Sequence, residues 1–195
     1  MKKIFAIFAF LCAAVINIQA ERVFVGAEQT KLYLPLLKGK RVALLSNHTG
    51  IVIQGTDTIH TLDLLLKHGV EVTAIFSPEH GFRGTAREGE HVASSIDEKT
   101  GIPILSLYDG KSQRPSKEAM QTFDILITDI QDVGLRFYTY YVTMYRLMNA
   151  CASESKQFMV FDRPNPNGFY VDGPILDMKH KSGVGALPIP VVHGM

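Results

Sequence analysis

Short apolar runs bounded by turn residues alternate along this chain with stretches of helical periodicity. The apolar runs are continuous and lack the alternation of a half-exposed strand; they cover residues 41–46, 72–76, 103–107, 124–129 and 158–161. Continuous runs of this length are typical of strands that are buried on both faces. Residues 189–192 predict a further strand, which Pro190 confines to an edge or an irregular position.

The segments between the runs predict helices over residues 58–68, 115–122 and 138–154. In the first of them Ile59, Leu62 and Leu66 share one face, and Gly69 supplies the C-terminal stop. Strands alternating with helices predict an α/β fold, with a Rossmann-like and mostly parallel sheet flanked by helices. No G-x-G-x-x-G follows the first strand, which argues against dinucleotide binding.

Polar side chains follow nearly every predicted strand. The residues at these exits are Asn47, His48, Glu79, His80, Tyr108, Asp109, Asp129, Gln131, Asp132, Asp162, Arg163, Asn165 and His193. Because ligands of open α/β sheets bind outside the carboxyl ends of the strands, this edge is the predicted site. The opposite edge carries an ordinary solvated mixture of charges.

Several of these residues have a structural alternative. The side chains of Asp129 and Asp132 would serve as caps of the helix that follows as well as in a site. Asn47 suits an Asx turn, in which its side chain bonds the backbone two residues on. Of the three tyrosines at 138, 140 and 141, two are expected in packing.

The N-terminus has the pattern of a secretory signal peptide. Lys2 and Lys3 precede an unbroken apolar run over residues 4–16, and Ala20 is a small residue at the expected cleavage site. The run is shorter than the ~20 residues that span a bilayer, so no membrane anchor is expected. We predict a signal peptide over residues 1–20, one domain over residues 21–195, and a secreted or periplasmic protein.

Removal of residues 1–20 takes two lysines, and the formal net charge falls from +1 to −1. A near-neutral chain without a basic run argues against nucleic acid as a partner. One cysteine, Cys151, remains, so no internal disulfide is available and packing must hold the fold. About 175 residues suffice for a single domain with a sizeable core.

The loop after the second predicted strand is the richest in chemistry. Residues 77–84 place a carboxylate, an imidazole and a guanidinium between a proline and two glycines, in the order Ser-Pro-Glu-His-Gly-Phe-Arg-Gly. Residues 162–168 form a second polar, proline-constrained loop, Asp-Arg-Pro-Asn-Pro-Asn-Gly. Polar loops held rigidly at a sheet edge favour an active site over a routine turn.

Together with Asp-Ile-Gln-Asp-Val-Gly-Leu-Arg-Phe-Tyr-Thr-Tyr at 129–140 and Val-His-Gly-Met at 192–195, these loops resemble one family, the exo-β-N-acetylmuramidases. The resemblance covers residues 22–195. It implies a secreted glycosidase, without a cofactor, that releases terminal N-acetylmuramic acid from the non-reducing end of peptidoglycan fragments. Its partners would be muramyl saccharides.

The resemblance also implies roles for residues. Glu79 takes the catalytic position, and His80 is also placed in the catalytic set. His80 and Arg83 are expected to orient Glu79 or to bind the lactyl carboxylate. Arg83, Arg136 and Arg163 are rivals for the lactyl carboxylate that distinguishes the muramyl sugar. The second catalytic group is left open between Glu88, Glu90, Asp129 and the substrate's own acetamido group. The remaining predicted substrate-binding residues are Asn47, Gln131, Tyr138, Asn165 and His193, with Asp129 also in this set.

Family members enclose the site between this domain and a C-terminal auxiliary domain, whereas the sequence stops at Met195. We therefore expect a fragment or a truncated product with half a cleft, able to fold but nearly inert. Two alternatives stay open. One is a non-catalytic sugar-binding remnant. The other is a metal-dependent hydrolase whose ligands would be His48, His80, Asp129 and His193, although their spacing matches no metal motif.

Overall fold

The computed structural model describes residues 22–82, 94–107 and 114–194. Within them the chain folds around a six-stranded sheet with the order β5-β6-β4-β1-β7-β8, in which β5 alone is antiparallel to its neighbour. The predicted Rossmann-like, mostly parallel sheet is confirmed. The strands are β1 (Arg41–Ser46), β4 (Glu71–Ser77), β5 (Ser95–Ile96), β6 (Pro103–Ser106), β7 (Ile125–Asp129) and β8 (Gln157–Val160).

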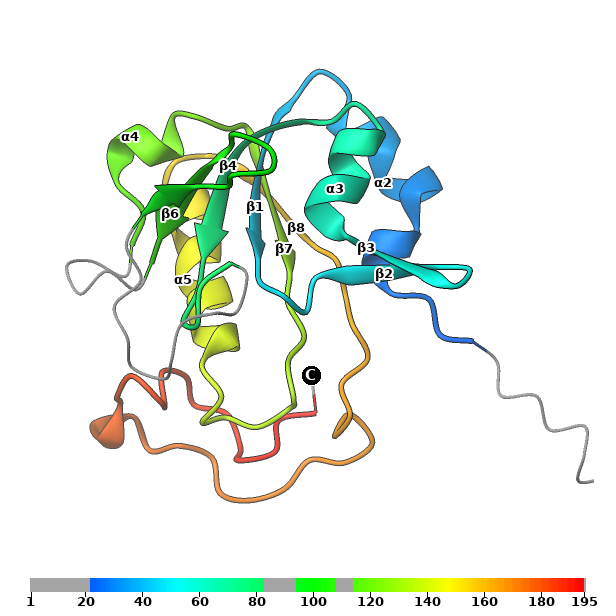
Figure 1. Ribbon diagram of the computed structural model, residues 1–195. Coiled ribbons are helices and arrows are strands. Elements are labelled where there is room, and N and C mark those ends of the chain that lie inside the picture. The colour runs from blue at the N-terminus through cyan, green and yellow to red at the C-terminus, as the bar shows by residue number, and fades with distance from the viewer. Residues whose placement is uncertain (1–21, 83–93, 108–113, 195) are drawn as a thin grey trace, which may run out of the picture.

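Helices cover both faces of the sheet (Figure 1). On one face α2 (Thr30–Leu37) and α3 (Thr61–Lys67) pack on Val42 and Leu44 of β1. On the other face α4 (Lys117–Met120) and α5 (Tyr140–Ser153) pack on Ala43 and Leu45. Successive residues of a strand point to opposite faces, so both sets must be apolar. This double burial is the reason that the strands have continuous apolar runs.

The strand order creates a switch point between β1 and β7. From β1 the chain moves outward to β4 and β6, and it then returns to β7 and continues to β8 on the other side. In such sheets the loops at the switch point separate and leave a crevice at the carboxyl ends of the strands. The segment over 161–194, which includes η2 (Met178–His180), runs across this edge (Figure 1).

A hairpin replaces the first turn of one predicted helix. β2 (Ile51–Gln54) and β3 (Asp57–His60) pair antiparallel, and the helix expected over 58–68 begins only at Thr61. Gly55, at a φ of 65°, provides the positive φ that a tight hairpin turn between these strands requires. Ile59 was counted on the helix face, but its pairing with Val52 places it in the hairpin.

The expected strand over 189–192 was also wrong. Val192 forms only isolated bridges, to Leu135 and to Asp172, and Pro190 has no N–H to extend a ladder. The helices expected over 115–122 and 138–154 form, with shorter bounds. Helix α2 and the preceding η1 (Gly26–Glu28) were not predicted from the sequence. Cys151, a residue of α5, is buried, and burial raises the pKa of its thiol to about 11.

Candidate active site

The exits of β1 and β7 meet at the switch point, where a polar network joins them. Asn47 is buried, and its Oδ1 accepts hydrogen bonds from the backbone N of Thr49 at 2.9 Å and from Thr49 Oγ1 at 2.6 Å. The backbone N–H of Gln131 donates to Thr49 Oγ1 at 3.0 Å. Asn47 thus forms the Asx turn that the sequence left open as its alternative.

Asp129, the last residue of β7, is fully buried beneath this network. Its carboxylate accepts hydrogen bonds from Arg163 Nε at 2.6 Å, from Arg163 Nη2 at 3.0 Å and from the Thr61 hydroxyl. Arg163 also donates to the carbonyl of Ile51 at 3.0 Å. Asp129 and Arg163 were both predicted to bind substrate. Their geometry favours a structural role instead, tying β7 to the segment after β8 and to the hairpin.

The loop after β4 holds Glu79 against the start of α5. Glu79 Oε2 accepts a hydrogen bond at 3.1 Å from the hydroxyl of Thr139, the residue before the helix. His80 has a φ of 71°, a left-handed conformation that is uncommon outside glycine. Phe82 is buried, and its ring packs edge-on to that of His60 at 4.9 Å. The loop is therefore a compact turn with a defined carboxylate position.

Glu79 and His80 lie in the wall of a cavity of about 640 Å³. Of the other predicted site residues, Gln131 and Tyr138 line the same cavity. The remaining wall comes from the loop after β1, from α5 and the residues before it, and from the segment after β8, and includes His48, Thr49, Val133, Phe137, Thr139, Tyr140, Val142, Thr143, Arg146, Gly183 and Val184. A cavity of this size is in the range of small-ligand sites.

The cavity wall combines charged groups with exposed aromatic rings. Phe137 and Tyr138 are 53% and 48% exposed, and their ring centroids lie 5.5 Å apart. Tyr140 is half-buried, and burial raises the pKa of its hydroxyl. The Asn47 side chain opposes this rise in pKa by hydrogen bonding, and the negative charge of Glu79 adds to it. Tyr140 therefore lies within electrostatic reach of both groups.

A second, smaller cavity of about 170 Å³ adjoins at Tyr140, which lines both. It brings together the predicted residues Arg163, Asn165 and His193. His193 Nε2 lies 3.3 Å from Asp132 Oδ1, and the His193 backbone N–H donates to the carbonyl of Gly134 at 3.0 Å. Seven predicted residues thus divide between two neighbouring cavities, whereas Asn47, Asp129 and Arg136 line neither.

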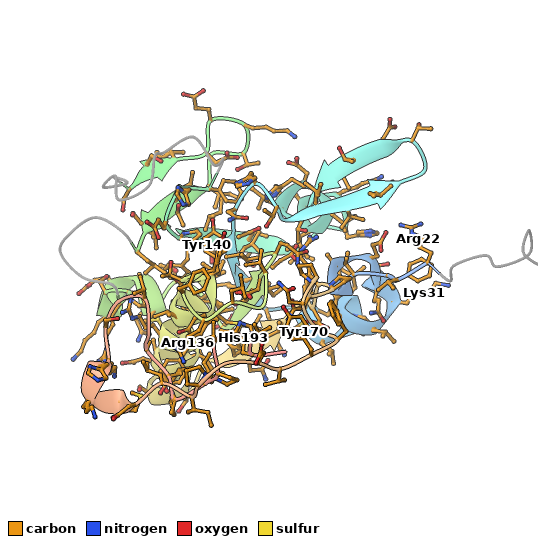
Figure 2. The ribbon with its side chains drawn as sticks, turned by 90° about the horizontal axis from the view of Figure 1, so that it is seen from below. Arg22, Lys31, Arg136, Tyr140, Tyr170 and His193 are labelled. Atoms are coloured by element: carbon orange, nitrogen blue, oxygen red, sulfur yellow. The ribbon has the colours of Figure 1, made fainter. Side chains whose placement is uncertain are left out.

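Arg136 lines neither cavity and is bonded to the segment over 161–194. Its Nη1 donates to the carbonyls of Pro174 at 2.8 Å and Ile189 at 2.7 Å. Figure 2 looks onto this edge and shows Arg136 and His193 near the segment, with Tyr140 above them. Among the other predictions, the signal peptide, Arg83, Glu88, Glu90, Tyr108 and Asp109 lie outside the described residues.

Two further properties concern metals and membranes. The described residues contain no group of three or more His, Cys, Asp or Glu side chains placed to hold a metal ion. His48, His80, Asp129 and His193 are all described, so the metal-dependent alternative has no ligand set among them. In the described part of the chain, no helix has the length and apolar character needed to cross a bilayer.

Sequence reasoning did not select Thr139, Phe137 or Arg146, which all line the larger cavity. The helix expected over 138–154 contained a pattern that indicated two of these residues, Thr139 and Arg146. Residues 139, 143 and 146 recur at helical spacing and therefore share a face. Val184 carried no signal, because it reaches the cavity from a segment without regular structure.

Residues 42–195 match the family model described as "Exo-beta-N-acetylmuramidase NamZ, N-terminal". The chain belongs to this family. It is 48% identical over 165 residues to the peptidoglycan beta-N-acetylmuramidase NamZ of Bacillus subtilis strain 168. This match covers 84% of this chain and 39% of that relative. The resemblance seen in the sequence is therefore confirmed.

Two solved structures of DUF1343 family proteins from Bacteroides fragilis NCTC 9343 have the same fold. One is 60% identical with a TM-score of 0.77, and the other is 36% identical with a TM-score of 0.78. Each match covers 90% of this chain and 44% of the solved one. The chain thus spans about two fifths of the length of the NamZ-family relatives it matches.

Proposed function

We propose that this protein is an exo-acting glycoside hydrolase that releases terminal N-acetylmuramic acid from the non-reducing end of peptidoglycan fragments. Family membership and the name of the B. subtilis relative support the reaction class. The observation that carries the proposal is the position of Glu79. Its carboxylate lies in the wall of a cavity of about 640 Å³ at the switch point of the sheet and accepts a hydrogen bond from Thr139.

The chemistry of the cavity suits a sugar. Cleavage of a glycosidic bond requires an acid that protonates the leaving oxygen. Glu79 supplies this carboxyl group, and His80 beside it lines the same wall. The exposed rings of Phe137 and Tyr138 provide apolar area for a sugar ring, while Gln131 contributes an amide. Binding pockets typically combine apolar walls with a few polar groups in this way.

The second catalytic group must act on the anomeric carbon or on water. Asp129 is fully buried and bonded to Arg163 and Thr61, which argues against direct contact with a sugar. This leaves Glu88 and Glu90, which lie outside the described residues, and the acetamido group of the substrate. The two glutamates and the acetamido group imply different mechanisms, because a substrate-assisted route needs no nucleophile from the protein.

We also propose that the protein acts outside the cytoplasm, in peptidoglycan turnover. Lys2, Lys3 and the apolar run over 4–16 support export by a signal peptide. Mass spectrometry of the exported protein should find Glu21 or a neighbour as the first residue. Recovery of the intact N-terminus in cytosolic protein would contradict export.

Replacement of one carboxylate tests the reaction. In the full-length gene product, Glu79→Gln keeps the shape of the side chain and removes its transferable proton. We expect kcat for a chromogenic N-acetylmuramide to fall by roughly 10²–10⁴, the usual worth of general acid–base assistance. The matched control is Glu71→Gln, at the other end of the same strand β4. It should leave kcat unchanged.

Two outcomes would count against this proposal. Activity of Glu79→Gln within about threefold of the unsubstituted protein removes Glu79 from the acid role, because the expected loss is far larger. If the unsubstituted protein binds the sugar without turnover, the non-catalytic alternative is correct. Circular dichroism and urea unfolding of each variant separate lost chemistry from lost folding.

A further inference from the structure

An enzyme selective for N-acetylmuramic acid must recognise the lactyl carboxylate that N-acetylglucosamine lacks. Arginine is the side chain best suited to this, because its planar guanidinium binds a carboxylate through two hydrogen bonds. The sequence indicated Arg83, Arg136 and Arg163. In the structure Arg163 is bonded to buried Asp129, and Arg136 is bonded to two backbone carbonyls. Neither lines the cavity that contains Glu79.

Among the described arginines, Arg146 does line that cavity. We propose that Arg146 binds the lactyl carboxylate of the terminal muramyl residue and sets the preference for this sugar. The inference rests on the proposed function, since it names how the same site selects its substrate. Arg146 is a fourth arginine, on α5, beside the three that the sequence indicated, of which Arg83 lies outside the described residues.

The position of Arg146 on α5 fits this role. Thr139, which donates to Glu79, and Arg146 lie on the same helix face, with Thr143 between them in the cavity wall. Seven residues along a helix correspond to a rise of about 10 Å. Helical side chains lean toward the N-terminus, so the Arg146 side chain covers the turn that separates it from Thr139. The acid and the guanidinium therefore face one cavity with room for a sugar between them.

The charges around Arg146 favour an anion at this end of the cavity. Arg146 also lines an adjoining cavity of about 560 Å³, whose wall includes Arg114, Lys117 and Lys181 and one carboxylate, Glu154. A cluster of cations raises the local potential and attracts a carboxylate. Glu79 lies at the opposite end, near the start of α5. A muramyl sugar would place its glycosidic oxygen toward Glu79 and its lactyl group toward Arg146.

The main competing role for Arg146 is structural, because Gly183 and Val184 of the C-terminal segment line the cavity beside it. A structural role would affect all substrates equally. The test therefore compares two chromogenic substrates, an N-acetylmuramide and an N-acetylglucosaminide, in the full-length gene product. The variants are Arg146→Met, which keeps the length of the side chain without its charge, and Arg146→Lys, which keeps the charge without the planar fork.

We expect Arg146→Met to lower kcat/KM for the muramide by roughly 10- to 100-fold, the worth of a charged hydrogen bond. The glucosaminide value should change by less than about threefold, well below that loss. Arg146→Lys should retain an intermediate preference. The control is Arg22→Met, whose side chain is exposed and which Figure 2 shows at the far side of the molecule from Tyr140. It should leave the preference unchanged.

An unchanged preference in Arg146→Met, or an equal loss on both substrates, overturns the inference. A second measurement does not depend on turnover. Calorimetry of N-acetylmuramic acid binding to Glu79→Gln, with and without Arg146→Met, should show weaker binding when Arg146 is absent. Equal affinity, or no binding to the parent variant, also overturns it. These failures are distinct from failure of the proposed function, which is decided by the activity of Glu79→Gln and by turnover in the unsubstituted protein.

Discussion

Strands β1 and β7 lie side by side, and an arginine–aspartate pair stands at each end of them. At the amino edge Arg41 Nη2 lies 2.8 Å from Asp124 Oδ1, and each side chain is 42% exposed. At the carboxyl edge Arg163 Nε lies 2.6 Å from Asp129 Oδ1, and the side chains are 6% and 0% exposed. The two pairs have the same chemistry and similar distances, but they differ in contact with water.

The difference in burial assigns the two pairs different roles. An exposed ion pair gains little because water screens it and competes for its hydrogen bonds. A buried pair leaves a charge without water or partner when one member is removed. Asp129 and Arg163 therefore fasten the segment after β8 across the edge where the cavities lie. The edge that carries the cavities is thus held by a buried aspartate, whereas Glu79 lines the larger cavity.

The strongest test of this comparison is Asp129→Asn. The substitution leaves the Arg163 guanidinium buried without its counter-charge, and breaking such a pair typically costs about 3–5 kcal/mol. We expect the free energy of unfolding, measured with urea, to fall by this amount. Asp124→Asn at the amino edge is the matched control and should cause a much smaller loss. Equal losses in the two variants would show that burial does not distinguish the pairs.

A smaller effect, on catalysis, is expected from a substitution beside Glu79. Thr139→Val removes the hydroxyl that donates to Glu79 at 3.1 Å but keeps the shape of the side chain. A hydrogen bond to a charged group is worth ~1.5–3 kcal/mol, so kcat should fall by about 10- to 100-fold. Stability should change little. Thr122→Val, whose hydroxyl bonds the carbonyl of Ala119 away from the site, controls for loss of a threonine hydroxyl. A kcat as high as that of the control would separate Thr139 from catalysis.

The smallest expected effect is on the pH dependence of stability, through the ion pair at the amino edge. The Arg41 guanidinium and backbone lower the pKa of Asp124 to about 2 through hydrogen bonds. Because the pKa is depressed in the folded state, the stabilisation is present above the unfolded value of about 3.9 and is lost as the pH falls toward 2. Asp124→Asn should flatten the decline of stability in this pH window, measured by urea unfolding. An unchanged pH dependence would show that this carboxylate does not contribute.

Much of the architecture could be predicted from local pattern. The strand over 41–46 was predicted with the bounds that the structure gives it, because burial on both faces makes every residue of β1 apolar except at its ends. The loop over 77–84 was predicted to be functional because its carboxylate, imidazole and guanidinium are poor material for a hydrophobic core, and this stays a prediction. The hairpin of β2 and β3 was missed, since Ile59 of β3 also fits the helical period of Leu62 and Leu66.

The sequence by itself determined the five parallel strands of the sheet, the edge at which polar groups gather and the family to which the chain belongs. Each of these depends on periodicity or on contiguous motifs. Only the tertiary structure decided which of those polar groups line a cavity. Arg163 lies 34 residues from Asp129 in the chain, and only the fold brings the two together at a buried site. Arg146 reaches the cavity of Glu79 for the same reason, because α5 returns along the sheet beside the loop after β4. A local pattern indicates whether a side chain is polar, whereas the fold determines its partner.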